Sequence, residues 1–401
     1  MMTLSDRSLE AGFSLVRGGP FHGLLRRARG GSESPRAAVL TAATLAAVSW
    51  TPIVLLSLAA GTAYGAGVRV PFLMDLPAHV RLLAGIPLLL LAELVVDGRL
   101  APIVAHLADS GLLPAHAREA YRRELAAVAR RRDSIVAEAF LLVLVVTLVV
   151  GSVTWSGAAR PAEGANTWFS SWENGQERIS SAGWWYLLVG APLFQFLLLR
   201  WIWRLWIWAR FLWALSRLDL LVIPSHPDQA GGLAVLAETQ MAFISVLLAP
   251  AAAFSASLAR MILQEGHTLA QCKVAIGTFM IVGAGVILGP LLAFTGRLAA
   301  ARRRGLLEYG STAQALSNRF RHGWMEKEIR SGPEGAPGIE IVSAVADFGG
   351  VFEAVRKMRV VPFEARQAAQ VVVVLAVPFL PLALMELSVK EILKRVATIL
   401  L

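Results

Sequence analysis

The sequence predicts an all-α fold, a multi-pass transmembrane helical bundle with about six or seven crossings and cytoplasmic helical extensions. First, hydrophobic residues make up 56% of the 401 residues and charged residues only 16%, whereas a soluble domain carries about 25% charged residues. Second, the apolar residues gather in stretches near the ~20 residues that a helix needs to cross a bilayer. Third, basic residues concentrate in alternate loops between these stretches, which is typical of cytoplasmic loops.

The candidate crossings follow one another along the chain. They are residues 38–60, 78–97, 136–153, 184–206, 241–262, 273–296 and 368–387. The second is the weakest, because Arg81 and Glu93 interrupt it, and it either spans the bilayer or is re-entrant. The last, 368–387, is followed by a short basic tail, so its crossing also stays open.

Arginine-rich segments set the orientation, because basic residues stay on the cytoplasmic side. We expect a bacterial inner-membrane protein with a cytoplasmic N-terminus and, after seven crossings, a periplasmic C-terminus. The expected parts are a cytoplasmic basic tail (1–37), a region with six transmembrane helices (38–296), a cytoplasmic helical region (297–367), and a final helix with a short tail (368–401). The six-helix region includes a cytoplasmic basic loop (98–135), an external loop (154–183), and a cytoplasmic stalk and elbow (207–240).

The fourth crossing runs into a stretch of alternating arginines and tryptophans. These residues are Arg200, Trp201, Trp203, Arg204, Trp206, Trp208, Arg210 and Trp213. Tryptophan prefers the headgroup level, and arginine there reaches toward phosphate. We therefore predict membrane-interface anchors on a helix that leaves the bilayer as a stalk. The alternative is an arginine ladder as in voltage sensors, but the irregular arginine spacing does not favour it.

The fifth and sixth crossings form a predicted tight hairpin joined by residues 264–271. Gly285 and Gly289 make a GxxxG pair, which allows close approach of a neighbouring helix. Ser255 adds a hydroxyl group to the fifth crossing. Two interpretations stay open for Ser255, Gly285 and Gly289: helix packing, or the lining of a narrow pore.

A polar elbow, Ser225-His226-Pro227-Asp228-Gln229-Ala230-Gly231-Gly232, precedes the fifth crossing. Its residue types suit the start of a helix. One interpretation is an anion- or lipid-binding site made of Arg217, His226, Asp228, Gly231 and Gly232, with His226 and Asp228 also a candidate acid–base pair. The other is a structured turn that feeds the next helix.

The sequence gives little support for metal, cofactor or catalytic chemistry. Cys272 is the single cysteine, and the seven histidines show no metal-ligand spacing. We expect no metal, no cofactor and no catalytic residues. The net charge of +10 is explained by basic loops that attract anionic lipids of the bilayer, so nucleic acid is not an expected partner.

Three spaced motifs carry a resemblance. HPDQAGGLAVL, RRRGLLEYGSTAQALSNRF and SAVADFGGVFEAVRKMRVVPF occur in this order within residues 185–395. They resemble a family of bacterial multi-pass inner-membrane proteins that carry HPDxxGGL, LLEYG and MRxVPF motifs. The chain departs from that family at 340–347, where it reads EIVSAVAD. The resemblance implies a membrane location and a shared fold, but no agreed reaction.

Function is expected to be non-enzymatic. The first hypothesis is an oligomeric channel or transporter-like assembly, because membrane-embedded charge is sparse and small residues line the helices. The alternative is an accessory or scaffold subunit of a larger membrane complex. An enzyme that acts on lipid headgroups through His226 and Asp228 ranks third.

Overall fold

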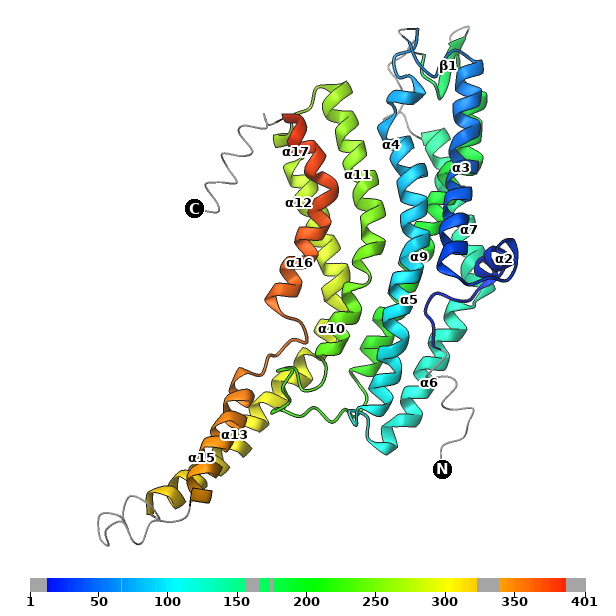
Figure 1. Ribbon diagram of the computed structural model, residues 1–401. Helices are drawn as coiled ribbons and strands as arrows, with labels where there is room; N and C mark the ends of the chain where they lie inside the picture. Colours follow the sequence, from blue (N-terminus) through cyan, green and yellow to red (C-terminus); the bar gives the residue numbers. More distant parts are fainter. Residues whose placement is uncertain (1–12, 66, 156–165, 174–175, 323–338, 387–401) are drawn as a thin grey trace.

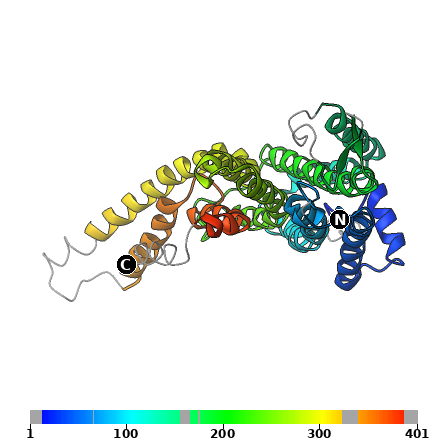
Figure 2. The ribbon, with the colours of Figure 1, turned by 90° about the horizontal axis from the view of Figure 1, so that it is seen from above.

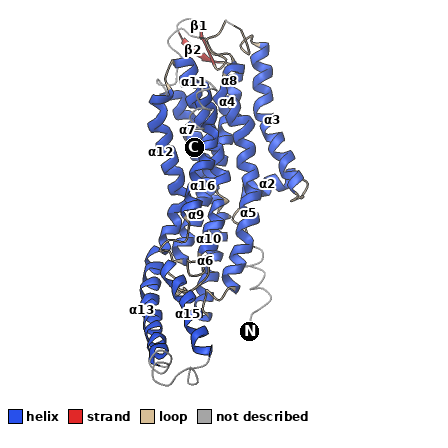
Figure 3. Cartoon of the chain, turned by 60° about the vertical axis from the view of Figure 1, so that its left-hand side comes forward, coloured by secondary structure: helices blue, strands red, loops and turns tan. Residues whose placement is uncertain are grey.

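The computed structural model describes residues 13–65, 67–155, 166–173, 176–322 and 339–386. Helices dominate this part of the chain, and one small sheet caps one end (Figures 1 and 3). The expected tail residues 1–12 and 387–401 lie outside the described residues. The all-α fold class is confirmed.

Within the described residues, seven helical stretches are long and apolar enough to cross a membrane. They are Pro35–Ala59, Leu76–Asp109, Ile135–Ser152, Ser181–Leu215, Ala234–Glu265, Leu269–Phe320 and Ala365–Leu384. Each overlaps one of the seven predicted crossings. The second, weakest by sequence, is 34 residues long with a mean hydropathy of 1.9, so its length and composition suit a full crossing.

The bundle has two groups of helices that share α11 (Ile244–Glu265). On one side, α11 contacts α4 (Leu76–His79), η2 (Val80–Gly85) and α5 (Ile86–Asp109). On its other side it contacts the C-terminal helices, which are α12 (Leu269–Leu288), α16 (Ala365–Ala376), η7 (Val377–Phe379) and α17 (Leu380–Glu386). Figure 1 shows this second group beside α11.

The first group also holds the N-terminal and central helices. They are α2 (Pro20–Ala28), α3 (Pro35–Ala59), α7 (Ile135–Trp155), α8 (Ser181–Trp185), η3 (Tyr186–Gly190), α9 (Ala191–Leu215) and α10 (Ala234–Met241). Ser34 starts α3 by accepting a hydrogen bond from the Ala37 amide, with Pro35 at the first helical position. Short 3-10 segments η1 (Phe72–Met74) and η4 (Gly289–Phe294) complete the set.

The turn between α11 and α12 is fixed by local chemistry. Gly266 ends α11 with a φ of 75°, a left-handed conformation that favours glycine. Thr268 and Gln271 then form a capping box at the start of α12. The predicted hairpin through 264–271 is therefore present.

Two long helices leave the bundle at the end opposite the sheet. They are α13 (Thr295–Phe320) and α15 (Ile339–Lys357), which pack on one another and extend to one side of the bundle (Figures 1 and 2). The basic helix α6 (Ala115–Arg132) lies at the same end, which we call the basic end. Tyr121 on α6 donates to the Val104 carbonyl at 2.7 Å and ties α6 to α5.

The loop expected at 154–183 contains a small antiparallel sheet. Strand β1 (Ser170–Glu173) pairs with β2 (Gln176–Ile179), with Ser170 opposite Ile179. Trp168 is buried and donates to Asp75 at 2.8 Å. The loop therefore covers one end of the bundle (Figure 3). We call this end, where β1 and β2 form a β-hairpin, the hairpin end.

The fourth crossing does not continue as a free stalk. The stretch from Ser181 to Leu215 is 35 residues long, and α9 packs on α5, α6 and α7. Its far half buries Trp208, Phe211 and Leu215. Residues 207–215 thus form part of the bundle, because α6 folds back and covers them.

Candidate functional site

A large cavity lies between helices at the hairpin end. Its volume is about 1180 Å³, and its walls come from α4 and η2, from α7, from η3 and α9, and from α11. Thr167, Trp168 and Phe169 of the capping loop, with three residues of β2, close it over. The cavity is thus lined by four separate crossings in addition to the loop.

Two π-helical segments form neighbouring parts of the wall. Arg81 lies on η2 and Tyr186 on η3. Each segment is followed by a Gly-x-Pro sequence, Gly85-Ile86-Pro87 and Gly190-Ala191-Pro192. Because proline lacks an amide hydrogen, it disrupts the regular α-helical ladder on its N-terminal side. Single π-turns within helices are rare and frequently occur at functional sites.

Glycine lets these two segments approach closely. A Cβ atom added at Gly85 would lie 2.5 Å from the Phe194 ring of α9. A Cβ at Gly190 would lie 3.0 Å from Leu82 of η2. The cavity wall therefore depends on small residues at both crossing points.

Arg81 carries the clearest chemical signal in the cavity. Its Nη1 donates to the Tyr186 hydroxyl at 3.0 Å, and its Nη2 donates to the Ser257 hydroxyl at 3.4 Å. Both acceptors are neutral, and no ion pair joins Arg81 to a carboxylate within the described residues. The nearby Asp75 carboxylate binds the Ala78 amide and the Trp168 indole instead. A part-buried guanidinium with neutral partners favours an anion.

Gln195 marks the other side of the same cavity. Its Oε1 is buried and accepts no hydrogen bond from the described residues. An unpaired buried amide oxygen is costly, so a hydrogen-bond donor in the cavity would stabilise it. Beyond Gln195, the next layer between α7 and α9 is apolar, with Leu141, Val145 and Phe196 buried together.

A second polar centre lies deeper in the bundle. Glu93 Oε1 on α5 accepts from Arg200 Nη1 at 2.7 Å and from Arg204 Nη1 at 2.8 Å. Glu138 on α7 lies 3.4 Å from Arg200 Nε. Two arginines and two glutamates thus balance in charge, and ionisable side chains inside a membrane bundle are retained for function or for assembly.

The N-terminal segment completes this ionic cluster. Arg204 donates to the Val16 carbonyl at 2.6 Å, and Arg200 donates to the Gly18 carbonyl at 3.3 Å. Arg132 donates to the Ser14 carbonyl. Leu15 and Val16 are buried beside it. Residues 13–18 are therefore held inside the bundle by arginines from α6 and α9.

The prediction of membrane-interface anchors is wrong for four of its eight residues. Arg200, Trp201, Arg204 and Trp208 are each at most 3% exposed. They face the bundle interior, because Glu93, Glu138 and the N-terminal carbonyls bind the arginines there. Trp203 is half-buried, and Trp206, Arg210 and Trp213 remain on the outer surface, so for them the interface role stays a prediction.

The elbow brings all three sequence motifs together. Ser225 of the elbow lies 3.0 Å from the Tyr309 hydroxyl of the LLEYG motif. The backbone amide and guanidinium of Arg359, in the MRxVPF motif, donate to the carbonyls of Gln229 and Asp228, both at 2.7 Å. The elbow therefore joins the bundle to the α13–α15 hairpin and to α16.

The elbow carboxylate is occupied by backbone amides. Asp228 accepts from Ala230, Gly232 and Ala234 at 2.8–3.1 Å, and its Oδ1 lies 2.8 Å from His226 Nδ1. Partial burial raises the pKa of Asp228, but these hydrogen bonds outweigh it and hold the pKa below its usual value. This geometry supports the structured turn and gives Asp228 no free oxygen for acid–base chemistry.

The other candidate residues of the anion site also have structural roles. Gly231 and Gly232 have φ values of 64° and 91°, and a Cβ at Gly231 would lie 2.3 Å from Val222. Arg217 is exposed and stacks on Trp213 at 3.9 Å. Within the described residues, no hydrogen bond or ion pair joins Arg217 to His226 or Asp228. The structure does not assemble these five residues into one anion site.

The small residues predicted at the fifth and sixth crossings have different surroundings. Ser255 is buried in α11. A Cβ added at Gly285 or Gly289 would meet nothing within 4 Å, so this GxxxG pair packs against no helix in the described part of the chain. Gly283, two residues earlier, is the glycine of α12 that contacts Leu375 of α16.

Metal chemistry has no candidate in the described part of the chain, where no group of three His, Cys, Asp or Glu could hold an ion. No protein-family model, curated protein sequence or solved structure matches the chain. The case for function therefore rests on the cavity and its residues.

Proposed function

We propose that the protein is a transporter-like membrane protein that binds a small anionic solute in the cavity at the hairpin end. The observation that carries this proposal is Arg81, whose guanidinium in a cavity of about 1180 Å³ has, among the described residues, only the hydroxyls of Tyr186 and Ser257 as hydrogen-bond partners. A carboxylate, phosphate or similar anion would form a direct charge-assisted hydrogen bond with this guanidinium, and Gln195 would accept from a hydroxyl or amine of the same solute.

The proposed setting is the bacterial inner membrane with the basic end in the cytoplasm. The arginine-rich helices α6 and α13 gather at that end, opposite the sheet. In this orientation the N-terminus is cytoplasmic, the cavity faces the periplasm, and the last described helix, α17, ends toward the periplasmic side (Figure 1). Resemblance to the inner-membrane family with the three motifs is consistent with the same setting.

An oligomer is part of the proposal. The Gly285–Gly289 pair lies on a face of α12 where Ile281 and Val282 are also exposed, and a second copy could approach closely there. The cavity itself is built within one chain. A transporter-like assembly with one site in each copy is thus favoured over a pore on a shared axis.

Anion-dependent thermal stability of the purified protein tests the proposal. A ligand that binds only the folded state raises the melting temperature. We expect one of phosphate, acetate, succinate or chloride, at matched ionic strength, to raise it for the natural chain. Arg81→Gln should abolish that shift. Arg99→Gln removes the same charge from an exposed site on the same stretch and should preserve it.

Transport is then measured in proteoliposomes with the stabilising anion. Uptake that requires the natural Arg81 supports a transporter. Equal stabilisation of the Arg81→Gln variant, or no response of the natural chain to any of the anions, would overturn the anion site.

A second candidate function is a scaffold subunit. The α13–α15 hairpin projects from the bundle (Figure 2) and exposes Leu307 and Val351, which would suit docking onto a partner. Affinity purification from native membranes with Leu307→Glu as the comparison tests it, because a specific partner should be lost from the variant. The third-ranked lipid-headgroup enzyme gains no support, since Asp228 is bound by backbone amides.

A further inference from the structure

A groove lies on the outer surface near the basic end, where the turn between α6 and α7 meets α9. Its volume is about 530 Å³, and its walls include Arg130, Arg131, Ser134, Ala137, Phe140 and Trp203. None of these residues lines the cavity of the proposed anionic solute. The groove is therefore a separate feature.

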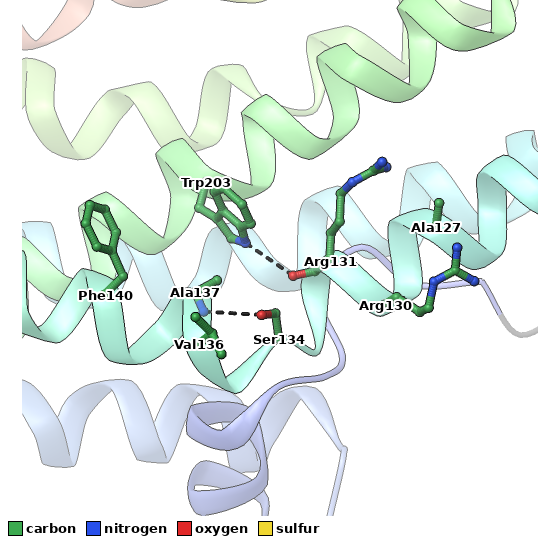
Figure 4. A pocket seen from close by; sticks show the side chains of 8 residues that line it. All are labelled: Ala127, Arg130, Arg131, Ser134, Val136, Ala137, Phe140 and Trp203. Carbon is green, nitrogen blue, oxygen red and sulfur yellow. Dashed lines mark hydrogen bonds between the residues drawn. The ribbon is translucent and has the colours of Figure 1, made fainter.

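The groove has a basic end and an apolar end. Figure 4 shows Trp203 reaching from α9 toward the α6–α7 turn, with Phe140 on one side and the two arginines on the other. Helix α6 ends in Arg130, Arg131 and Arg132, whereas the groove-lining residues of α7, Val136, Ala137 and Phe140, are apolar. A change from arginine to apolar side chains along one groove matches the change from headgroup to acyl chain in a phospholipid.

Exposure places this change at the membrane boundary. Ile135 and Val136 are 70% and 78% exposed at the very start of α7, and Phe140 is 65% exposed. Exposed apolar surface of this kind is typical of contact with a membrane or a partner protein, and the stretch Ile135–Ser152 is long and apolar enough to cross a membrane. We therefore place the start of the hydrocarbon at about Ser134, beside the two arginines.

The charges of Arg130 and Arg131 are not neutralised by any described carboxylate. Their neighbour Arg132 pairs with Asp133 at 2.6 Å and binds the Ser14 carbonyl. Among the described residues, neither Arg130 nor Arg131 forms an ion pair. Both side chains line the groove, and guanidinium groups at the headgroup level that lack an ion-pair partner among the described residues can bind a lipid phosphate.

Trp203 forms a fixed wall for an acyl chain. Its indole Nε1 donates to the Arg131 carbonyl at 3.4 Å, and its ring stacks on Trp206 with 4.9 Å between centroids. The same side chain thus links the basic end to the apolar end. We propose that this groove binds one anionic phospholipid, with its phosphate at Arg130 and Arg131 and an acyl chain along Ala137, Phe140 and Trp203.

Native mass spectrometry of protein extracted from nanodiscs containing phosphatidylglycerol and phosphatidylcholine tests the proposal. The natural chain should retain phosphatidylglycerol in preference to phosphatidylcholine. Each basic residue near an anionic surface strengthens attachment about five-fold, so Arg130→Ala with Arg131→Ala should weaken retention roughly 25-fold. The control, Arg118→Ala with Arg123→Ala, removes the same charge from exposed positions of α6 outside the groove and should retain the lipid.

A steric variant tests the apolar half without changing charge. Ala137→Phe places a ring inside the groove, whereas Ala139→Phe places the same ring on the exposed face of α7. We expect the first to lose the bound lipid and the second to keep it, with both eluting as folded protein. Equal lipid retention by the two arginine double variants, or by the two phenylalanine variants, would overturn the site. If the natural chain retained phosphatidylcholine as well as phosphatidylglycerol, the site would also be overturned.

Discussion

Arg204 on α9 pairs with Glu93 on α5 at 2.8 Å between Nη1 and Oε1, and both side chains are buried. Arg200 shares the same carboxylate oxygen at 2.7 Å. One glutamate therefore holds two arginines inside the bundle, and these arginines in turn hold the N-terminal segment through the Val16 and Gly18 carbonyls.

Glu93→Gln should be strongly destabilising. It leaves two buried guanidinium groups with Glu138 alone, and the loss of one partner of a buried ion pair costs about 3–5 kcal/mol. Glu33→Gln, which breaks the exposed pair with Arg17, should cost at most about 1 kcal/mol. Thermal unfolding in detergent, with limited proteolysis near residues 13–18, measures both. Equal melting temperatures for the two variants would contradict this account.

The elbow should respond to one added methyl group. Gly231→Ala forces a side chain into a φ of 64° and sets its Cβ against Val222, so we expect a loss of roughly 1–3 kcal/mol. Gly350 lies in helix α15 with open space around it, and Gly350→Ala should stabilise by about 0.4–1 kcal/mol. If the melting temperatures of Gly231→Ala and Gly350→Ala shift in the same direction, the elbow does not require glycine at position 231.

Asp228 should make the elbow sensitive to acid. Its pKa in the folded protein is lowered because the backbone hydrogen bonds outweigh partial burial. A lowered pKa gives stability that is present above the unfolded-state pKa and is lost as the pH falls through the folded-state pKa. The melting temperature should therefore drop below about pH 4. Asp228→Asn should be less stable at neutral pH and should lose Asp228's share of this acid dependence; an unchanged acid profile would contradict the assignment.

The crossings could be predicted because hydrocarbon demands ~20 apolar residues wherever a helix spans it, and that demand is local in sequence. The fate of Arg200 and Arg204 could not. Their burial depends on Glu93, Glu138 and residues 13–18, which are distant along the chain, so the local pattern of arginine and tryptophan suggested the lipid interface instead.

Arg81 is visible in the sequence, but its role in a cavity is not. It appears in the sequence as an interruption of the weakest crossing, yet its partners Tyr186 and Ser257 come from two other crossings. The repeated Gly-x-Pro after both π-segments is the local pattern that could have pointed to this pair of helices. For the elbow, the sequence allowed both an anion site and a structured turn, and the contacts of Asp228 with neighbouring amides support the turn.

Gly85 tests whether η2 packs closely against α9 beside the cavity. Gly85→Ala brings a Cβ within 2.5 Å of the Phe194 ring, and forced overpacking of this kind costs about 1–3 kcal/mol. Phe194→Leu removes the atoms that clash, so the double variant Gly85→Ala/Phe194→Leu should recover stability relative to the sum of the single changes. Gly98→Ala, at an open position of the same helix, should remain within about 1 kcal/mol of the natural chain. Thermal unfolding measures all four variants. Strict additivity of Gly85→Ala and Phe194→Leu would show that the two residues do not meet, and the arrangement of η2 against α9 would then need revision.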